Sequence, residues 1–474
     1  STNDRRAFLM VYVTYQIQQV FELQKKHQHV VKRTSAAERI QKLQKLKTII
    51  RTQTPAILQA LQQDLEKPSF EAVTTEVLGV IHEIDRFIAS LEQWMQPVEV
   101  ATQSVGATAR IMWEPKGQCL IFSAWNFPFY LLFLPLIPAI GAGNVCILKP
   151  SEMAPATSRL ATKIVREVFE ESEVAIFEGG VDVAEALLAL PFHHIFFTGS
   201  TSIGKHVMQA AAKHLASVTL ELGGKCPVVV DEHVDLEKMT PRIAFGKFAN
   251  AGQICLAPDY VFVKEHQLEE FVQHVEAYVQ RSYFENGQLT QTDMAKIMNE
   301  RNLQRLQDLL EDAVSRGAKV RFGGTIEDER IHPTLLTDVP LEAKIMQEET
   351  FGPIMPVLTY TDLDEVIEYI DSKPKPLALY IFSDRQRIVD NLLARTTSGG
   401  ATVNDVMRHM AEPNLPFGGI NESGIGRYTG VYGFKEFSHE RGVLFQAPVG
   451  SNPMEEFARA PYKGKLETLM QRLK

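Results

Sequence analysis

The sequence is poor in cysteine: its 474 residues include four, and none of the four stands in a CxxC pair. Disulfide-stabilised domains and structural zinc sites need cysteines at closer and more regular spacing, so the sequence disfavours both classes. We therefore expect no metal site. Thiols so few and so scattered are typical of a reducing compartment, which predicts a cytoplasmic protein.

The chain also lacks a basic excess and an apolar run of membrane length. Its formal net charge is −9 and no basic stripe stands out, which argues against a nucleic-acid partner. The apolar stretch at 127–143 carries prolines and is shorter than the roughly 20 residues of a transmembrane helix, so we expect a buried helix and no membrane span. Residues 7–15 follow two arginines as in a signal peptide, but no cleavage site follows, and we set residues 1–12 apart from the fold.

A chain of this length should divide into two or three domains. Short β-rich runs alternate with helical stretches over 119–222, and again over 227–383. Such alternation indicates parallel sheets covered by helices on both faces. The expected fold class is therefore α/β, with two doubly wound parallel-sheet domains that meet near residues 222–226. Alternating Val, Ala, Thr and Ile around Gly106 predict a β-hairpin over 99–114.

Cys119, Cys146 and Cys226 lie in apolar runs, where a free cysteine is usually a small buried hydrophobe. Cys255 differs, because it lies in FANAGQICLAPD (248–259) among small residues at an expected helix-to-strand junction. A reactive thiol needs a particular environment, which the neighbouring sequence alone does not define. An inert Cys255 therefore stays open as the alternative.

Two strand ends have residues suited to a nucleotide. In FTGSTSIG, the small residues Gly199, Ser200 and Gly204 lie where a strand enters a helix, so a phosphate could approach the backbone N–H groups there. A plain tight turn is the alternative. LKPSE places Lys149 and Glu152 at the carboxyl end of a parallel strand, where open α/β sheets bind ligands. A solvated surface pair is the alternative for these two.

Two further strand ends carry residues suited to catalysis. Asn126 in WNFP follows a strand and lies between aromatic and proline neighbours, so its amide could donate to a developing oxyanion. Glu221 in ELGGK lies between two leucines, where partial desolvation should raise its pKa toward that of a general base. A turn asparagine and a salt-bridged structural glutamate are the alternatives. All these residues should meet at one edge of a sheet.

Seven motifs, in this order, resemble those of the NAD(P)-dependent aldehyde dehydrogenase superfamily over residues 15 to 445. They are WNFP, LKPSE, FTGS, ELGGK, GQIC, EETFGP and PFGGINESGIG. The context of the cysteine and the NDV at 404–406 are most similar to the class-three, or fatty-aldehyde, branch.

The resemblance implies a catalytic role for each of three residues. Cys255 would be the nucleophile that attacks the aldehyde carbon, giving a thiohemiacetal and, after hydride transfer, a thioester. The Asn126 amide and the backbone N–H of Cys255 would stabilise the oxyanion. Glu221 would activate the water that hydrolyses the thioester to a carboxylic acid.

The resemblance also implies NAD as the cofactor, with NADP as a second choice. Lys149 and Glu152 match family positions near the adenosine ribose. Gly199, Ser200 and Gly204 match the pyrophosphate turn, and Glu349 and Phe351 match the positions that hold the nicotinamide ribose and ring. A carboxylate accepts a hydrogen bond from the 2′-OH of NAD and repels the 2′-phosphate of NADP, whereas Lys149 attracts that phosphate. Glu152 therefore predicts a preference for NAD.

The family fold implies domain boundaries. A Rossmann-like cofactor-binding domain would take 14–98 and 115–222, and a catalytic domain would take 223–415. A small β element for bridging and oligomerisation would take 99–114 and 416–450. The branch resemblance predicts a homodimer.

These features predict NAD(P)-dependent oxidation of a hydrophobic aldehyde, medium- or long-chain aliphatic or aromatic, to its carboxylic acid. Ile254 and Leu256 flank the nucleophile with bulk, which favours an apolar substrate channel. One alternative is a CoA-acylating relative, in which CoA takes the thioester; Glu221 argues against it, because water needs a base. The other is a non-catalytic protein with this fold, which would have no chemical need for Cys255, Glu221 and Asn126 together.

Overall fold

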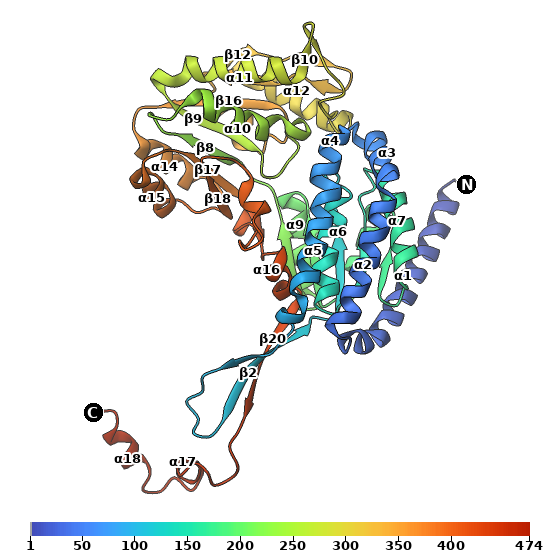
Figure 1. Cartoon of the computed structure of the whole chain (residues 1–474), viewed down its shortest axis with the longest axis vertical. Coiled ribbons are helices and arrows are strands. Elements are labelled where there is room, and N and C mark those ends of the chain that lie inside the picture. The colour runs from blue at the N-terminus through green and yellow to red at the C-terminus, as the bar shows by residue number, and fades with distance from the viewer. Residues whose placement is uncertain (1) are drawn as a thin grey trace.

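A mostly parallel sheet occupies one half of the molecule, which a computed structural model describes from residue 2 to residue 474 (Figure 1). The strand order is β19-β7-β6-β3-β4-β5, in which β19 alone runs antiparallel. The strands are β3 (Gln118–Phe122), β4 (Val145–Lys149), β5 (Val174–Ile176), β6 (His194–Thr198), β7 (Ser217–Glu221) and β19 (Gly424–Ile425). The register pairs Phe122 with Lys149 and Thr198 with Glu221, so the carboxyl ends meet at one edge.

Helices cover both faces of this first sheet, because alternate residues of each strand point to opposite faces. Cys119 and Ile121 face a core shared with α2, α3, α5, α6 and α7, whereas Leu120 and Phe122 face a core shared with α1, α8 and α9. The helices are α1 (Thr2–Lys32), α2 (Ala36–Thr52), α3 (Thr54–Leu65), α4 (Ser69–Glu71), α5 (Leu78–Trp94), α6 (Tyr130–Gly141), α7 (Pro155–Val168), α8 (Val181–Leu188) and α9 (Thr201–Ala212). The first sheet is thus doubly wound, as predicted.

One sequence expectation for these helices is wrong. Helix α1 begins at Thr2 and packs Met10 against the core, so residues 1–12 do not as a whole stand apart from the fold. The helical stretch from Ser69 to Trp94 is not regular: a π-helical turn, η1 (Ala72–Val77), joins α4 to α5. Such turns insert one extra residue and are frequent at functional sites.

The second sheet occupies the other half of the molecule, in the order β12-β15-β16-β9-β8-β17-β18. Its strands are β8 (Cys226–Val230), β9 (Pro258–Lys264), β12 (Lys319–Phe322), β15 (Thr334–Thr337), β16 (Ile354–Tyr360), β17 (Ala378–Phe382) and β18 (Gly400–Val403). Its helices are α10 (Leu236–Phe248), α11 (Leu268–Tyr283), α12 (Glu300–Ser315), α13 (Lys344–Gln347), α14 (Leu363–Ser372) and α15 (Gln386–Arg395). The expected junction at 222–226 falls between β7, in the first sheet, and β8, in the second.

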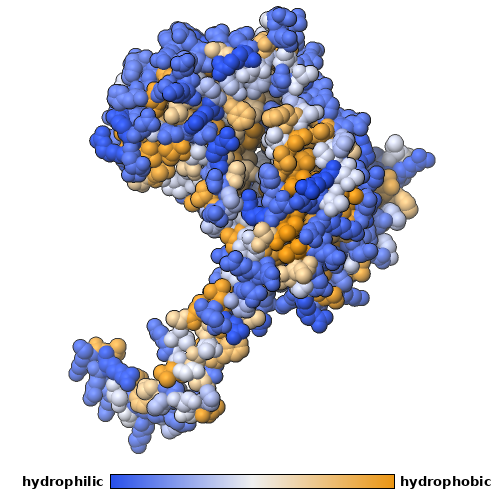
Figure 2. All heavy atoms as spheres, viewed as in Figure 1, coloured by the Kyte–Doolittle hydropathy of each residue, from blue (hydrophilic) through white to orange (hydrophobic). Residues whose placement is uncertain are grey.

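A three-stranded antiparallel sheet forms an arm that projects from the body, with the C-terminal tail beyond it (Figure 1). It consists of β1 (Val98–Val100), β2 (Thr108–Pro115) and β20 (Ser438–Phe445), and the tail carries α17 (Met454–Phe457) and α18 (Leu466–Gln471). Apolar side chains are interspersed along the arm (Figure 2). Val105, Leu444 and Phe445 are exposed. The stretch 416–450 also supplies β19 to the first sheet and α16 (Gly430–Glu436), which packs on α6. The predicted domain boundaries stay a prediction.

Within residues 2–474, no helix combines the length and the apolar character that crossing a membrane requires.

Candidate active site

Cys255 lies in a short turn between a 3-10 helix, η2 (Ala249–Gly252), and β9, at the junction expected from the sequence. Part of its surface is exposed, whereas the other three cysteines are buried, as predicted. Burial, and then the nearby carboxylates of Glu221 and Glu349, raise the pKa of the Cys255 thiol above its ordinary value. The resting thiol is therefore neutral and must lose its proton before it can act as a nucleophile.

The turn before Cys255 is held in an unusual backbone conformation. Asn250, Ala251 and Gly252 all have positive φ, at 52°, 54° and 74°. At Gly252 an added Cβ would lie 2.3 Å from the Gly352 carbonyl oxygen, which only a glycine avoids. Left-handed non-glycine residues are costly and persist where the surroundings fix them. The Cys255 turn is thus pressed against the EETFGP loop.

Asn126 lies directly beyond β3, buried at the carboxyl edge of the first sheet. Its side-chain Nδ2 donates to the Gln253 carbonyl oxygen at 3.2 Å, two residues before Cys255. A turn asparagine would bond its own loop, whereas this amide crosses to the other half of the molecule. The structure therefore brings Asn126 to the nucleophile turn.

Glu221 ends β7 and is buried, as the sequence predicted for it. Burial raises its pKa well above the ordinary carboxyl value, opposed by Arg427 and reinforced by Glu436. Within the described residues, its Oε1 is buried and has no hydrogen-bond partner. A structural glutamate would be paired, because an unpaired buried acceptor costs roughly 1–3 kcal/mol. This carboxyl is free to bond something that enters the site.

Glu349 and Phe351, in the loop between α13 and β16, face the same region. Burial, with the charge of Asp259, raises the pKa of Glu349 to about 8. The Glu349 carboxylate leaves no room for a side chain at Gly223, where an added Cβ would lie 1.9 Å from Oε2. The Phe351 ring meets Trp125 edge to face, with centroids 5.4 Å apart. A narrow hollow is lined by Ile254, Glu349 and Phe351 among others. The ELGGK, cysteine and EETFGP segments therefore meet there.

Sequence reasoning missed the residue that joins these loops, Asp259. Its carboxylate accepts from Lys225 Nζ at 2.5 Å and from the backbone N–H of Thr350 at 2.9 Å. It thereby connects ELGGK, the cysteine segment and EETFGP. Its place four residues after Cys255, at the start of a buried strand, was the available signal.

Lys149 and Glu152 form an ion pair at the end of β4, with Nζ and Oε2 2.9 Å apart. The two side chains differ in exposure, at 4% for Lys149 and 47% for Glu152. The alternative of a solvated surface pair therefore does not hold for Lys149. The exposed carboxylate keeps an acceptor for a hydroxyl group.

The FTGSTSIG turn leads from β6 into α9. Ser200 caps α9, its side chain accepting from the Ile203 N–H, and remains exposed. Gly199 is half-buried, and Gly204 is buried, where an added Cβ would meet Leu222 at 2.6 Å. Gly204 thus allows close packing of α9 rather than contact with a ligand. Thr198 Oγ1, at the end of β6, is buried without a partner in the described part of the chain.

These residues fit a dinucleotide. The exposed Glu152 carboxylate could bind one ribose, and the start of α9 could bind the pyrophosphate. The recessed Glu349 carboxylate, beside the Phe351 ring, could bind the second ribose and its ring. The buried Thr198 hydroxyl, which has no partner among residues 2–474, leaves a polar group open there. No group of three or more His, Cys, Asp or Glu side chains between residues 2 and 474 could hold a metal ion.

The expectation for the residues that flank Cys255 needs correction. Leu256 is 2% exposed and lies in the core, and its carbonyl oxygen accepts from the Tyr380 hydroxyl at 2.6 Å. The Leu256 side chain therefore cannot line a substrate channel. Ile254 stays partly exposed and lines the narrow hollow.

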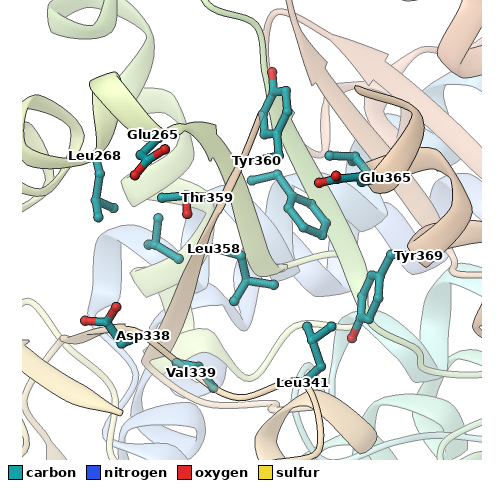
Figure 3. Close-up of a pocket in the computed structure, with 13 residues that line it drawn as sticks. Glu265, Leu268, Asp338, Val339, Leu341, Leu358, Thr359, Tyr360, Glu365 and Tyr369 are labelled. Atoms are coloured by element: carbon teal, nitrogen blue, oxygen red, sulfur yellow. The ribbon is translucent and has the colours of Figure 1, made fainter. Parts of the chain in front are cut away.

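A wider hollow, of about 430 Å³, lies elsewhere, over the second sheet between β16, α14 and the start of α11 (Figure 3). Figure 3 shows Tyr360, Glu365 and Tyr369 on one side of it and Glu265 on another. None of its lining residues is a cysteine or a histidine, or belongs to the residues predicted above. The candidate active site is therefore the loop cluster around Cys255.

Comparison with known proteins agrees with this geometry. Residues 12–443 match the Aldehyde dehydrogenase family. AldX of Bacillus subtilis (strain 168) is 48% identical over 435 residues, which cover 91% of this chain and 98% of the relative. The 4,4'-diaponeurosporen-aldehyde dehydrogenase of Staphylococcus aureus is 41% identical, covering 90% of this chain and 93% of its own. Mouse aldehyde dehydrogenase family 3 member A2 is 40% identical, covering 87% and 85%.

A solved structure has the same fold over nearly the whole length. The substrate-bound state of Staphylococcus aureus AldH aligns with a TM-score of 0.91 at 38% identity, covering 97% of this chain and 99% of that one. The family 3 relatives agree with the class-three resemblance of the motifs. The chain belongs to the aldehyde dehydrogenase family and is an NAD(P)-dependent enzyme.

Proposed function

We propose that the enzyme oxidises a hydrophobic aldehyde to its carboxylic acid through a cysteine thioester, with NAD preferred over NADP. The observation that carries the proposal is the buried Glu221 carboxyl at the end of β7, whose Oε1 has no hydrogen-bond partner among the described residues. A hydrolytic step needs a base in this place, and a transfer to a thiol does not.

The proposed steps use this chain's own residues in order. Cys255 loses its proton to a nearby carboxylate and forms a C–S bond to the aldehyde carbon, whose oxygen becomes an oxyanion. Asn126 Nδ2 and the Cys255 N–H stabilise that charge. NAD, which Glu152 and Glu349 would help to hold, would supply the acceptor for the hydride of this carbon, and loss of that hydride leaves a thioester on Cys255. Glu221 then removes a proton from water as the water attacks, the C–S bond breaks, and the acid departs.

Apolar groups around the site support a hydrophobic substrate. Trp125 and Phe351 meet edge to face beside the nucleophile turn, and Ile254 lines the hollow there. Aromatic side chains of this kind bury large apolar areas of a ligand. The relative named for 4,4'-diaponeurosporen-aldehyde supports the same class.

An aldehyde panel tests the proposal. NADH formation is followed with medium-chain aliphatic, aromatic and small polar aldehydes, each with and without CoA. We expect CoA-independent turnover, highest for the apolar aldehydes. Turnover that requires CoA would favour an acylating enzyme, and a strong preference for small polar aldehydes would contradict a hydrophobic substrate.

The cofactor preference is predicted to depend on Glu152. In Glu152→Gln the repulsion of a 2′-phosphate is lost while Lys149 remains, so the ratio of kcat/KM for NAD to that for NADP should fall by about tenfold. Steady-state kinetics with both cofactors measure the ratio. Glu170→Gln, a change at another exposed glutamate, should leave it unchanged. A wild-type enzyme that favours NADP would refute the proposed preference.

We also propose that the arm joins two copies of the chain as a homodimer. Its strands expose Val105, Leu444 and Phe445, and exposed apolar patches often mark interfaces. A sedimentation mass of two chains would support this, and a mass of one chain would contradict it. The cytoplasmic location stays a prediction from the cysteine content.

A further inference from the structure

A buried lysine, Lys67, binds the backbone of the loop that carries Asn126. Its Nζ donates to the Asn126 carbonyl oxygen at 2.9 Å and to Glu76 Oε2 at 2.9 Å. It also lies 4.1 Å from the centroid of the Phe127 ring. The ammonium group thus has three partners. Two of them, the Asn126 carbonyl and the Phe127 ring, belong to the segment 126–127.

Glu76 holds the same loop at a second place. Its Oε1 accepts from the backbone N–H groups of Phe129, at 3.0 Å, and Tyr130, at 3.2 Å, where α6 begins. The Lys67 and Glu76 side chains are both 0% exposed. Glu76 lies in η1, the π-helical turn that sequence periodicity did not predict. The ion pair therefore fixes both ends of the short loop from Asn126 to Tyr130.

A gain in folding stability does not explain why the charged pair of Lys67 and Glu76 is buried here. Replacing a buried ion pair by apolar residues of similar volume is often neutral or stabilising, because both ions lose their hydration. Moreover, the Asn126 carbonyl oxygen already has a neutral donor, since Asn250 Nδ2 lies 3.3 Å away. The position of this carbonyl does matter, because the Asn126 side chain reaches Gln253 in the nucleophile turn.

We propose that Lys67, held by Glu76, is a positioning residue that fixes the Asn126 backbone so that its amide points at the oxyanion. The inference rests on the proposed role of Asn126. A charge-assisted bond to a backbone carbonyl restrains the loop more strongly than a neutral donor does. A misplacement of about 1 Å can cost roughly 100-fold in rate, so a residue without contact to substrate can control the step.

The test is a double-mutant cycle between Lys67→Met and Asn126→Ala, read by the rate constant of the first-turnover burst of NADH. We expect Lys67→Met to lower this constant by about 10- to 100-fold in the wild-type background, with the KM for NAD unchanged. In the Asn126→Ala background the same change should have little further effect, because the group that it positions is gone.

A matched control is Arg39→Met. Arg39 is another buried cation bound to a backbone carbonyl, that of Gly141 at 3.0 Å. The other partners of its guanidinium group, which lie outside the site, are Lys32, Thr34 and Met95. Its replacement should lower the melting temperature and leave the burst within about twofold. If Lys67→Met does not fold, the variant Lys67→Met with Glu76→Gln removes the unpaired charge and takes its place in the cycle.

The outcomes separate the two proposals. A loss of the same factor in both backgrounds, or a wild-type burst in Lys67→Met, would overturn the positioning role alone. A wild-type burst in Asn126→Ala would overturn the oxyanion role of Asn126, and the positioning role with it.

Discussion

Aldehyde oxidation by the Cys255→Ser variant should fall by at least about 10⁴-fold, because a serine hydroxyl in the same place is a much weaker nucleophile than a thiolate. The Cys255 thiol is itself neutral at rest, since burial and the Glu221 and Glu349 carboxylates raise its pKa. Its sulfur can still form the thiolate when a neighbouring carboxylate takes the proton. Steady-state NADH formation with an apolar aldehyde measures the loss.

The matched control is Cys119→Ala, which removes a buried thiol from β3 in the first sheet. Turnover should stay within about twofold, because this side chain only fills space. Substantial NADH formation by Cys255→Ser would mean that the hydride leaves the aldehyde without a covalent cysteine adduct.

Glu221→Gln should separate the two halves of the reaction. Without the base, the first turnover still releases NADH, whereas hydrolysis slows by about 10²- to 10⁴-fold. Stopped-flow recording should therefore show a burst followed by a very slow steady state. An added small thiol should restore turnover, because a good nucleophile takes the thioester without a base.

The pH dependence gives a second reading of the same residue. Burial raises the pKa of Glu221 well above the ordinary carboxyl value, and only the ionised form accepts a proton. The steady-state rate of the wild-type enzyme should therefore rise with pH as Glu221 ionises, and Glu221→Gln should lose this rise. Glu265→Gln, in the separate hollow over the second sheet, should keep it. A Glu221→Gln variant with no burst, or with wild-type steady-state turnover, would contradict the assigned role.

Much of the fold could be predicted from the sequence, because most strands of the two sheets are short, apolar and buried. Runs such as CLIFS and ALYIF recur between helical stretches, which indicates a parallel sheet. Helix α12 (Glu300–Ser315) was not predicted, although Asn299 caps it and buried Leu306, Leu309 and Leu310 follow helical spacing. The turn η1 could not be predicted, because a π-helical turn breaks the 3.6-residue period on which such predictions rest.

Candidate site residues were predictable where they end a strand or closely follow one: Lys149 and Glu221 end β4 and β7, and Asn126 follows β3. What joins the loops was not predictable, because it depends on contacts between segments far apart in the chain. Asp259 ties Thr350 to the cysteine segment across 91 positions, and Lys67 reaches Asn126 across 59. No local pattern marks Lys67 as part of a site, and the place of Asp259 four residues after Cys255 does not show which groups its carboxylate binds. Leu256 is the opposite case: its position beside Cys255 in the sequence suggested a place in the site, but its side chain lies in the core.

Covalent capture of the substrate on Cys255 examines the proposed chemistry most directly. The Glu221→Gln variant is mixed with an apolar aldehyde and NAD, quenched in acid within the burst, and digested for mass spectrometry of the cysteine peptides. We predict one acyl group per chain, on the peptide that contains Cys255, and none on Cys119, Cys146 or Cys226. NADH release without an acylated Cys255 peptide would contradict a thioester on this cysteine.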